Sequence, residues 1–228
     1  MPCPTLLTRR TLLAAPLTLG DTGPAAATTR FADELAAFAR ADRDRRSPDG
    51  ALLFVGSSTI RLWPTLAERF APAAVVQRGF GGATLAEVHR HRTRLFAPHR
   101  PAAVVVYAGE NDIAEGATPG AVVEHWRALR RDLAGTPAGD APVVFIDLKP
   151  SPARFDLWPR MRAVNRAVRA LDQDRPAAFV DTAAFVLDDD GTPRPELFLP
   201  DALHFAEPGY VRLTRAVKAA LSDLGLRP

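Results

Sequence analysis

Apolar residues along the chain alternate between short continuous runs and longer stretches with helical spacing. Short continuous runs are typical of strands buried on both faces of a sheet. The predicted strands are 51–56, 73–79, 101–109, 141–148 and 177–182. The predicted helices are 29–45, 59–70, 84–96, 118–135, 158–174 and 207–225. This alternation predicts an α/β fold with one parallel sheet and helices on both of its faces.

Several helix ends are marked by capping residues. Thr84 and Glu87 have the spacing of a capping box, and Thr118 followed by Pro119 is a typical helix start. Pro64 lies inside the predicted helix 59–70, so it must occupy the first turns or bend the helix. No repeat or linker divides the region, and we expect residues 28–228 to form a single domain.

Four short polar stretches follow the apolar runs or precede the last helix. They are "GSS" at 56–58, "GFGG" at 79–82, "GEND" at 109–112 and "DALH" at 201–204. Each has an ordinary structural explanation when taken alone, such as a serine cap, a tight glycine turn or an aspartate cap. In parallel sheets, however, functional groups collect beyond the carboxyl ends of the strands. The four stretches are therefore expected to meet at one edge of the sheet.

Together these stretches contain the groups that acyl transfer requires. A serine of the first turn can act as nucleophile, and His204 can accept its proton. Asp201 can orient the imidazole, because it precedes the histidine by three residues. The amide of Gly82 and the side chain of Asn111 can donate to a developing oxyanion.

The four stretches resemble the blocks of the SGNH (GDSL-type) hydrolases, in the same order. Gly56-Ser57-Ser58 corresponds to the Gly-Asp-Ser block, so the resemblance makes Ser58 the nucleophile. It also makes Ser58, Gly82 and Asn111 the oxyanion hole, and His204 with Asp201 the other triad members. The family implies a three-layer α/β/α sandwich with a flavodoxin-like five-stranded parallel sheet, and ester hydrolysis without a cofactor. One departure is Ser57, which stands where the family usually has aspartate.

The expected substrate is a short-chain or acetyl ester, such as acetylated carbohydrate. The chain has no long apolar insertion of the kind that forms a lipase lid. A lysophospholipase or thioesterase of the same fold is the nearer alternative, and a non-catalytic accessory binding protein is a further one. Lys149 and Ser151 follow the fourth predicted strand, so they either line the substrate pocket or only shape a proline-rich loop.

Residues 1–27 have the composition of an export signal. Arg9 and Arg10 precede a short apolar stretch, and Ala25 and Ala27 offer a cleavage site. The arginine pair resembles a twin-arginine signal, so we expect a periplasmic or extracellular protein. The apolar stretch is too short to span a bilayer, and no stable membrane insertion is expected. Cleavage would remove Cys3, the only cysteine, and with it any thiol chemistry.

Composition and spacing argue against several other functions. The net charge of +3 and the scattered arginines do not favour nucleic-acid binding. The glycines at 79–82 lack the pattern of a dinucleotide site or a P-loop, so no nucleotide cofactor is expected. His89 and His91 lie on different faces of a helix, and the carboxylates at 188–190 are consecutive rather than alternating. No metal site is therefore expected.

Overall fold

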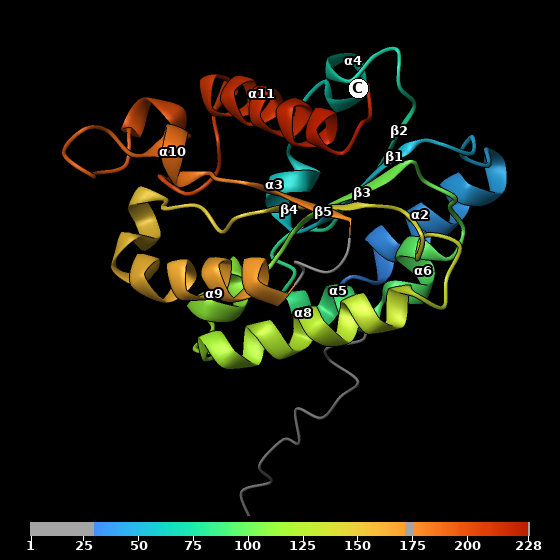
Figure 1. The fold of residues 1–228 in the computed structure, drawn as a ribbon, viewed down its shortest axis with the longest axis horizontal. Helices are drawn as coiled ribbons and strands as arrows, with labels where there is room; N and C mark the ends of the chain where they lie inside the picture. The colour runs from blue at the N-terminus through green and yellow to red at the C-terminus, as the bar shows by residue number, and fades with distance from the viewer. Residues whose placement is uncertain (1–29, 172–175, 228) are drawn as a thin grey trace, which may run out of the picture. The chain divides into compact units, whose positions relative to one another are not determined.

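The computed structural model describes residues 30–171 and 176–227, and within them a five-stranded sheet forms the centre of the fold (Figure 1). All paired strands are parallel, in the order β2-β1-β3-β4-β5. The strands are β1 (Leu52–Gly56), β2 (Val75–Gly79), β3 (Ala103–Tyr107), β4 (Val143–Ile146) and β5 (Ala177–Val180). The predicted α/β/α fold is confirmed. The strands are shorter than predicted, because residues at their ends lie in turns and do not pair with the neighbouring strand. The expected export signal at 1–27 lies outside the described residues.

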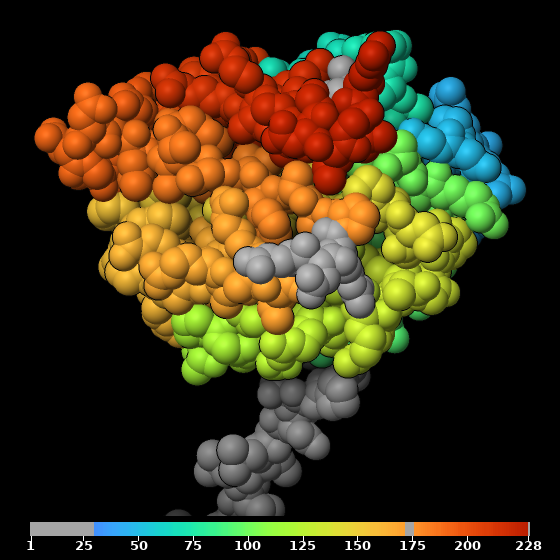
Figure 2. All heavy atoms as spheres, viewed as in Figure 1, coloured from blue at the N-terminus to red at the C-terminus, as the bar shows by residue number. Residues whose placement is uncertain are grey.

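Helices cover both faces of the sheet. The helical elements are α2 (Ala32–Asp44), α3 (Ser58–Arg61), α4 (Leu66–Arg69), α5 (Leu85–Arg90), α6 (Arg92–Phe96), α7 (Glu110–Ala114), α8 (Pro119–Leu133), η1 (Pro152–Leu157), α9 (Trp158–Leu171), α10 (Ala183–Val186), η2 (Pro195–Leu197) and α11 (Glu207–Asp223). Figure 1 shows α4 and α11 on one face and α5, α8 and α9 on the other. In the space-filling view, α11 forms the upper part of the visible surface and α8 and α9 the lower part (Figure 2). None of the helices in the described part of the chain has the length and apolar character needed to cross a membrane.

Two predicted helices are each divided into two short ones. The region 59–70 contains α3 and α4 separated at Pro64, because proline cannot continue the hydrogen-bond ladder of a preceding turn. The region 84–96 contains α5 and α6, which meet at His91. The predicted caps are confirmed: Thr84 and Glu87 form a complete capping box, and the Thr118 hydroxyl accepts from the Ala121 amide at 3.2 Å.

Buried side chains of the core hold α3, the helix that begins at Ser58, against α11, the last helix. All residues of β1 and β3 are buried. On the α11 face of the sheet, Trp63 packs edge-on to Phe54 and lies 5.5 Å from the ring of Tyr210. The Tyr210 hydroxyl donates to the Thr59 carbonyl in α3 at 3.0 Å. This bond links α3 to α11, the helix that directly follows the segment 201–206.

Candidate active site

The turn after β1 places Ser58 at the first position of α3. The Ser57 amide donates to the Tyr107 carbonyl at 2.9 Å, which continues the pairing of β1 with β3 for one more residue. The Ser57 carbonyl then accepts from the amides of Ile60 and Arg61, which starts the helix. The Ser57 side chain is buried and makes no capping hydrogen bond. The side-chain cap that would explain this serine pair structurally is therefore not formed.

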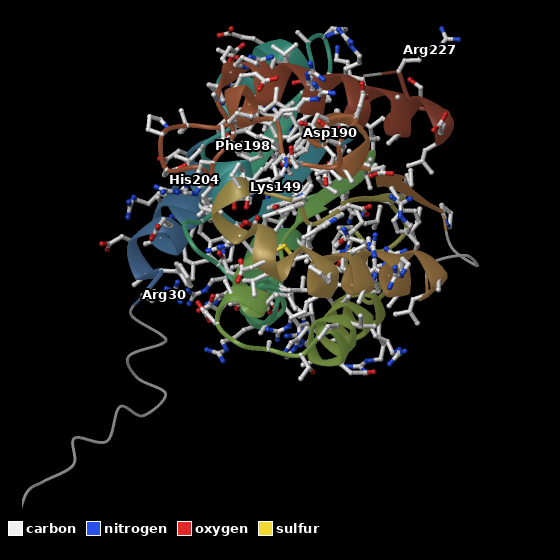
Figure 3. All side chains as sticks on the ribbon, turned by 90° about the vertical axis from the view of Figure 1, so that its left-hand side faces the viewer. Arg30, Lys149, Asp190, Phe198, His204 and Arg227 are labelled. Atoms are coloured by element: carbon white, nitrogen blue, oxygen red, sulfur yellow. The ribbon has the colours of Figure 1, made fainter. Side chains whose placement is uncertain are left out.

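His204 lies between Ser58 and Asp201. Its Nε2 is 2.9 Å from the Ser58 Oγ, and its Nδ1 is 2.7 Å from the Asp201 Oδ2. Figure 3, turned to face the left-hand side of Figure 1, labels His204. The structure thus joins the three predicted residues in one hydrogen-bonded chain, although Ser58 and His204 are 146 positions apart in the sequence.

Asp201 is held in place by its own turn. Its Oδ1 accepts from the backbone amides of Leu203 and His204 at 2.9 and 3.0 Å. The hydrogen bond from the His204 side chain, followed by those from the backbone, lowers the pKa of Asp201 to about 2. Asp201 therefore stays ionised at neutral pH and can stabilise a positive charge on the imidazole. Neither Asp201 nor His204 caps α11, whose N-cap is Ala206.

Asn111 is tied to the loop that contains Gly82. Its Nδ2 donates to the Ala83 carbonyl at 2.9 Å, and its Oδ1 accepts from Arg154 at 3.0 Å. Gly82 itself has a φ of +74°, which favours glycine at this turn. An amide NH₂ has two hydrogens, so Asn111 keeps a second one for another acceptor. These contacts place the two predicted oxyanion donors in adjoining segments.

Asp112 fixes the same loop from its other end. Its Oδ2 accepts from the Leu85 amide at 2.7 Å, in the first turn of α5. The capping box provides hydrogen-bond acceptors for the backbone amides of Thr84 and Glu87 in the same turn. The turn residues of "GEND" therefore do more than reverse the chain, because they join the ends of β2 and β3.

Lys149 and Ser151 are almost completely buried, at 1% and 0% exposure. The Lys149 Nζ donates to Glu110 at 2.6 Å and to the Tyr107 hydroxyl at 3.1 Å, and the Tyr107 hydroxyl in turn donates to Glu110. Ser151 makes a weak contact of 3.5 Å with the same carboxylate. Of the two alternatives for this pair, the structure favours the shaping of the loop over direct contact with substrate.

Arg154 and Glu110 are parts of this site that the motifs did not identify. Glu110 occupies the variable position of Gly-x-Asn-Asp, and Arg154 follows the "LKPSP" stretch. Burial acts to raise the pKa of Glu110, but the charges of Lys149 and Arg154 outweigh burial and hold this pKa below its usual range. The sequence did contain one signal for this cluster. Glu110 and Lys149 each follow a predicted buried strand, where an unpaired charge is costly, so they could have been expected to pair.

A separate buried carboxylate lies after β4. Asp147 is 5% exposed and binds Arg169 at 2.6 Å, while its Oδ1 has no protein partner. Burial raises its pKa to about 6, against the opposing effect of Arg169. Among the described residues, no group of three or more histidine, cysteine, aspartate or glutamate side chains is arranged to hold a metal ion.

This carboxylate gives a prediction for stability against pH. The folded state holds the Asp147 proton more tightly than the unfolded chain, so stability should fall as pH rises from about 4 to about 6, by roughly 2 to 3 kcal/mol. Asp147→Asn should remove this decline and unfold at a higher temperature than the wild type at pH 8. Thermal unfolding of both proteins between pH 4 and pH 8 measures the effect. Parallel curves for the two proteins would contradict it.

Comparison with known proteins gives a family match and a set of similar folds. The GDSL-like lipase/acylhydrolase family matches residues 20–212. A search of curated protein sequences found no significant match. Solved structures resemble the fold over most of its length.

A GDSL-like lipase from Bacteroides thetaiotaomicron is 19% identical, with a TM-score of 0.72 over 83% of this chain and 97% of that one. The Clostridium thermocellum family 3 carbohydrate esterase is 15% identical, with a TM-score of 0.63 over 78% and 97%. A catalytic mutant of an acetylxylan esterase from Geobacillus stearothermophilus is 17% identical, with a TM-score of 0.62 over 80% and 98%. At these identities the likeness establishes the shared fold.

Proposed function

The chain belongs to the GDSL-like lipase/acylhydrolase family and is a carboxylic ester hydrolase, and from this premise we propose that Ser58, His204 and Asp201 form its catalytic triad. The observation that carries the proposal is the hydrogen-bonded chain from Asp201 through His204 to Ser58, with distances of 2.7 and 2.9 Å. These are the separations at which a base can take a proton from a nucleophile.

In the proposed reaction, the Ser58 Oγ attacks the ester carbonyl while the His204 Nε2 accepts the serine proton. The imidazolium that forms is stabilised by ionised Asp201. His204 then protonates the departing alcohol, which leaves an acyl group on Ser58. In the second half, His204 removes a proton from water, and the resulting attack releases the acid and restores the serine.

The negative oxygen of each tetrahedral intermediate needs donors close to Ser58. We assign this role to the backbone amides of Ser58 and Gly82 and to the Asn111 side chain. The Ser58 amide also lies in the first turn of a helix, where backbone N–H groups point outward. Such donors stabilise charge that develops in the transition state more than they stabilise the substrate.

The proposed substrates are short-chain or acetyl esters, such as acetylated carbohydrate. Two of the similar structures are described as a carbohydrate esterase and an acetylxylan esterase, which supports this choice. The export expected from residues 1–27 is part of the same proposal, because an exported enzyme meets acetylated sugars of cell walls and plant polymers. A carbohydrate ester also needs no apolar lid over the site.

A chain-length series tests the substrate class. We expect kcat/KM for p-nitrophenyl esters to be highest for acetate and to fall by at least about tenfold by octanoate, because each added methylene must find apolar surface. Acetylated xylan and acetylated peptidoglycan, assayed for released acetate, measure action on polymers. Activity confined to long acyl chains or acyl thioesters would contradict the proposal and favour a lysophospholipase or thioesterase.

A further inference from the structure

The orientation of the Asn111 side chain is set by two neighbours of opposite hydrogen-bonding character. Arg154 offers only donors, so the atom that faces it must be the amide oxygen. The Ala83 carbonyl offers only acceptor sites, so the atom that faces it must be the amide nitrogen. The two contacts therefore exclude the flipped amide, which would turn an oxygen toward the Ala83 carbonyl. In the observed orientation, neither contact uses the second N–H of the amide.

Arg154 is itself held by a buried carboxylate. Its Nη1 lies 3.2 Å from the Glu110 Oε1, and the Glu110 side chain is only 4% exposed. The other oxygen of Glu110 binds Lys149 at 2.6 Å. A buried carboxylate between two cations is well compensated and has little freedom to move. Glu110 thus provides a rigid anchor for the Arg154 side chain, which remains partly exposed, at 21%.

The segment that carries Arg154 also contacts the segment of the proposed acid and base. The Ala153 amide donates to the Ala202 carbonyl at 3.0 Å, one residue after Asp201. Arg154 interrupts the helical geometry of η1, with φ of −133° and ψ of 26°. This kink belongs to a loop bonded on one side to the Asp201–His204 segment and on the other to Asn111.

We propose that Arg154 is a positioning residue that acts through Asn111, with Glu110 and Lys149 as its buried support. The inference rests on the proposed function of Asn111 as an oxyanion donor. The guanidinium holds the amide in its productive orientation. Its charge also polarises the amide carbonyl, which makes the opposite N–H a stronger donor. The stretch "LKPSPAR" thereby gains a role in the reaction without direct contact with the substrate.

A double-mutant cycle on the full chain tests this inference with p-nitrophenyl acetate. Asn111→Ala should lower kcat by about a hundred- to a thousandfold, the usual cost of one oxyanion donor. Arg154→Ala should lower kcat and kcat/KM by one common factor of about ten- to a hundredfold, since the donor acts in the transition state. The double variant should be no slower than Asn111→Ala, because Arg154 has nothing to position once the amide is gone.

Matched controls separate this role from a general loss of structure. Arg160→Ala removes a nearby arginine that donates to the carbonyls of Gly116 and Ala117, and it should keep the wild-type rate. Arg154→Lys should recover part of the lost rate, and added guanidinium ion should partly rescue Arg154→Ala. Rescue would not occur if Arg154 only kept the loop folded.

Three results would overturn the inference. Losses from Arg154→Ala and Asn111→Ala that multiply in the double variant would show that Arg154 acts independently of Asn111. A rise in KM at constant kcat would assign Arg154 to substrate binding instead. Wild-type rates for Asn111→Ala would remove the oxyanion role itself and the inference with it. In the first two cases the proposed triad and oxyanion hole would still stand.

Discussion

Replacing Ser58 with alanine is expected to lower kcat for p-nitrophenyl acetate by about 10⁴- to 10⁶-fold, as in other enzymes that lose a serine nucleophile. Alanine has no hydroxyl group that could attack the ester carbonyl. A water molecule would have to attack the ester directly, without the positioning that Ser58 provides. The fold should be retained, because Ser58 is only half-buried and the α3 backbone contacts do not use its side chain. Steady-state kinetics with matched thermal unfolding curves measures both effects.

The neighbouring serine supplies the matched control. Ser57→Ala removes a buried hydroxyl that caps nothing, so kcat should stay within about tenfold of the wild type. An active-site phosphonate should label the wild type and Ser57→Ala on Ser58, and should leave Ser58→Ala unlabelled. If Ser57→Ala were the inactive variant, the correspondence of this turn to the Gly-Asp-Ser block would be wrong. If both variants kept full activity, the proposed triad would fail.

The sheet could be predicted because burial on both faces leaves a strong local pattern. In β1 and β3 each residue is buried, and the corresponding letters are a continuous apolar run. The short helices were harder to predict. The region 59–70 has helical spacing throughout, yet Thr65 adopts a φ of +52° between α3 and α4. Pro64 was visible in the sequence, but the choice between a bent helix and two helices depends on packing around Trp63.

The contacts of the candidate site also differ in how well the sequence predicts them. Asp201 and His204 lie three residues apart, and their contact follows from local geometry once His204 is known to face Ser58. The contact of Arg154 with Asn111 joins positions 43 apart, and no spacing rule relates them. Lys149 follows the fourth predicted strand, and this position left open whether it lines the substrate pocket or only shapes the loop. Its contact with Glu110 favours the second alternative, and this pair becomes evident only when β3 and β4 are placed side by side.

Gly56 is the last residue of β1 and lies two positions before Ser58. Two independent features of the structure require a residue without a side chain at this position. An added Cβ would lie 2.0 Å from the Tyr107 carbonyl oxygen, which is a backbone atom in the adjacent strand and cannot swing aside. The residue also has a φ of +152°, a conformation that side chains disfavour. Any substitution must therefore separate β1 from β3 or change the direction of the chain just before Ser58.

Gly56→Ala is accordingly expected to destabilise the protein by roughly 3 to 5 kcal/mol, from backbone strain together with overpacking. Urea unfolding measures the loss as a lower midpoint at constant slope. Gly191→Ala is the matched control, because Gly191 also has a positive φ, of +75°, but an added Cβ meets nothing within 4 Å. The control should cost only about 1 kcal/mol, the usual penalty of that backbone conformation. Folded Gly56→Ala should also lose activity at low temperature, since the displaced turn moves the Ser58 Oγ away from His204. Equal midpoints for the two variants would show that the end of β1 tolerates a side chain, and that the turn does not depend on glycine to position Ser58.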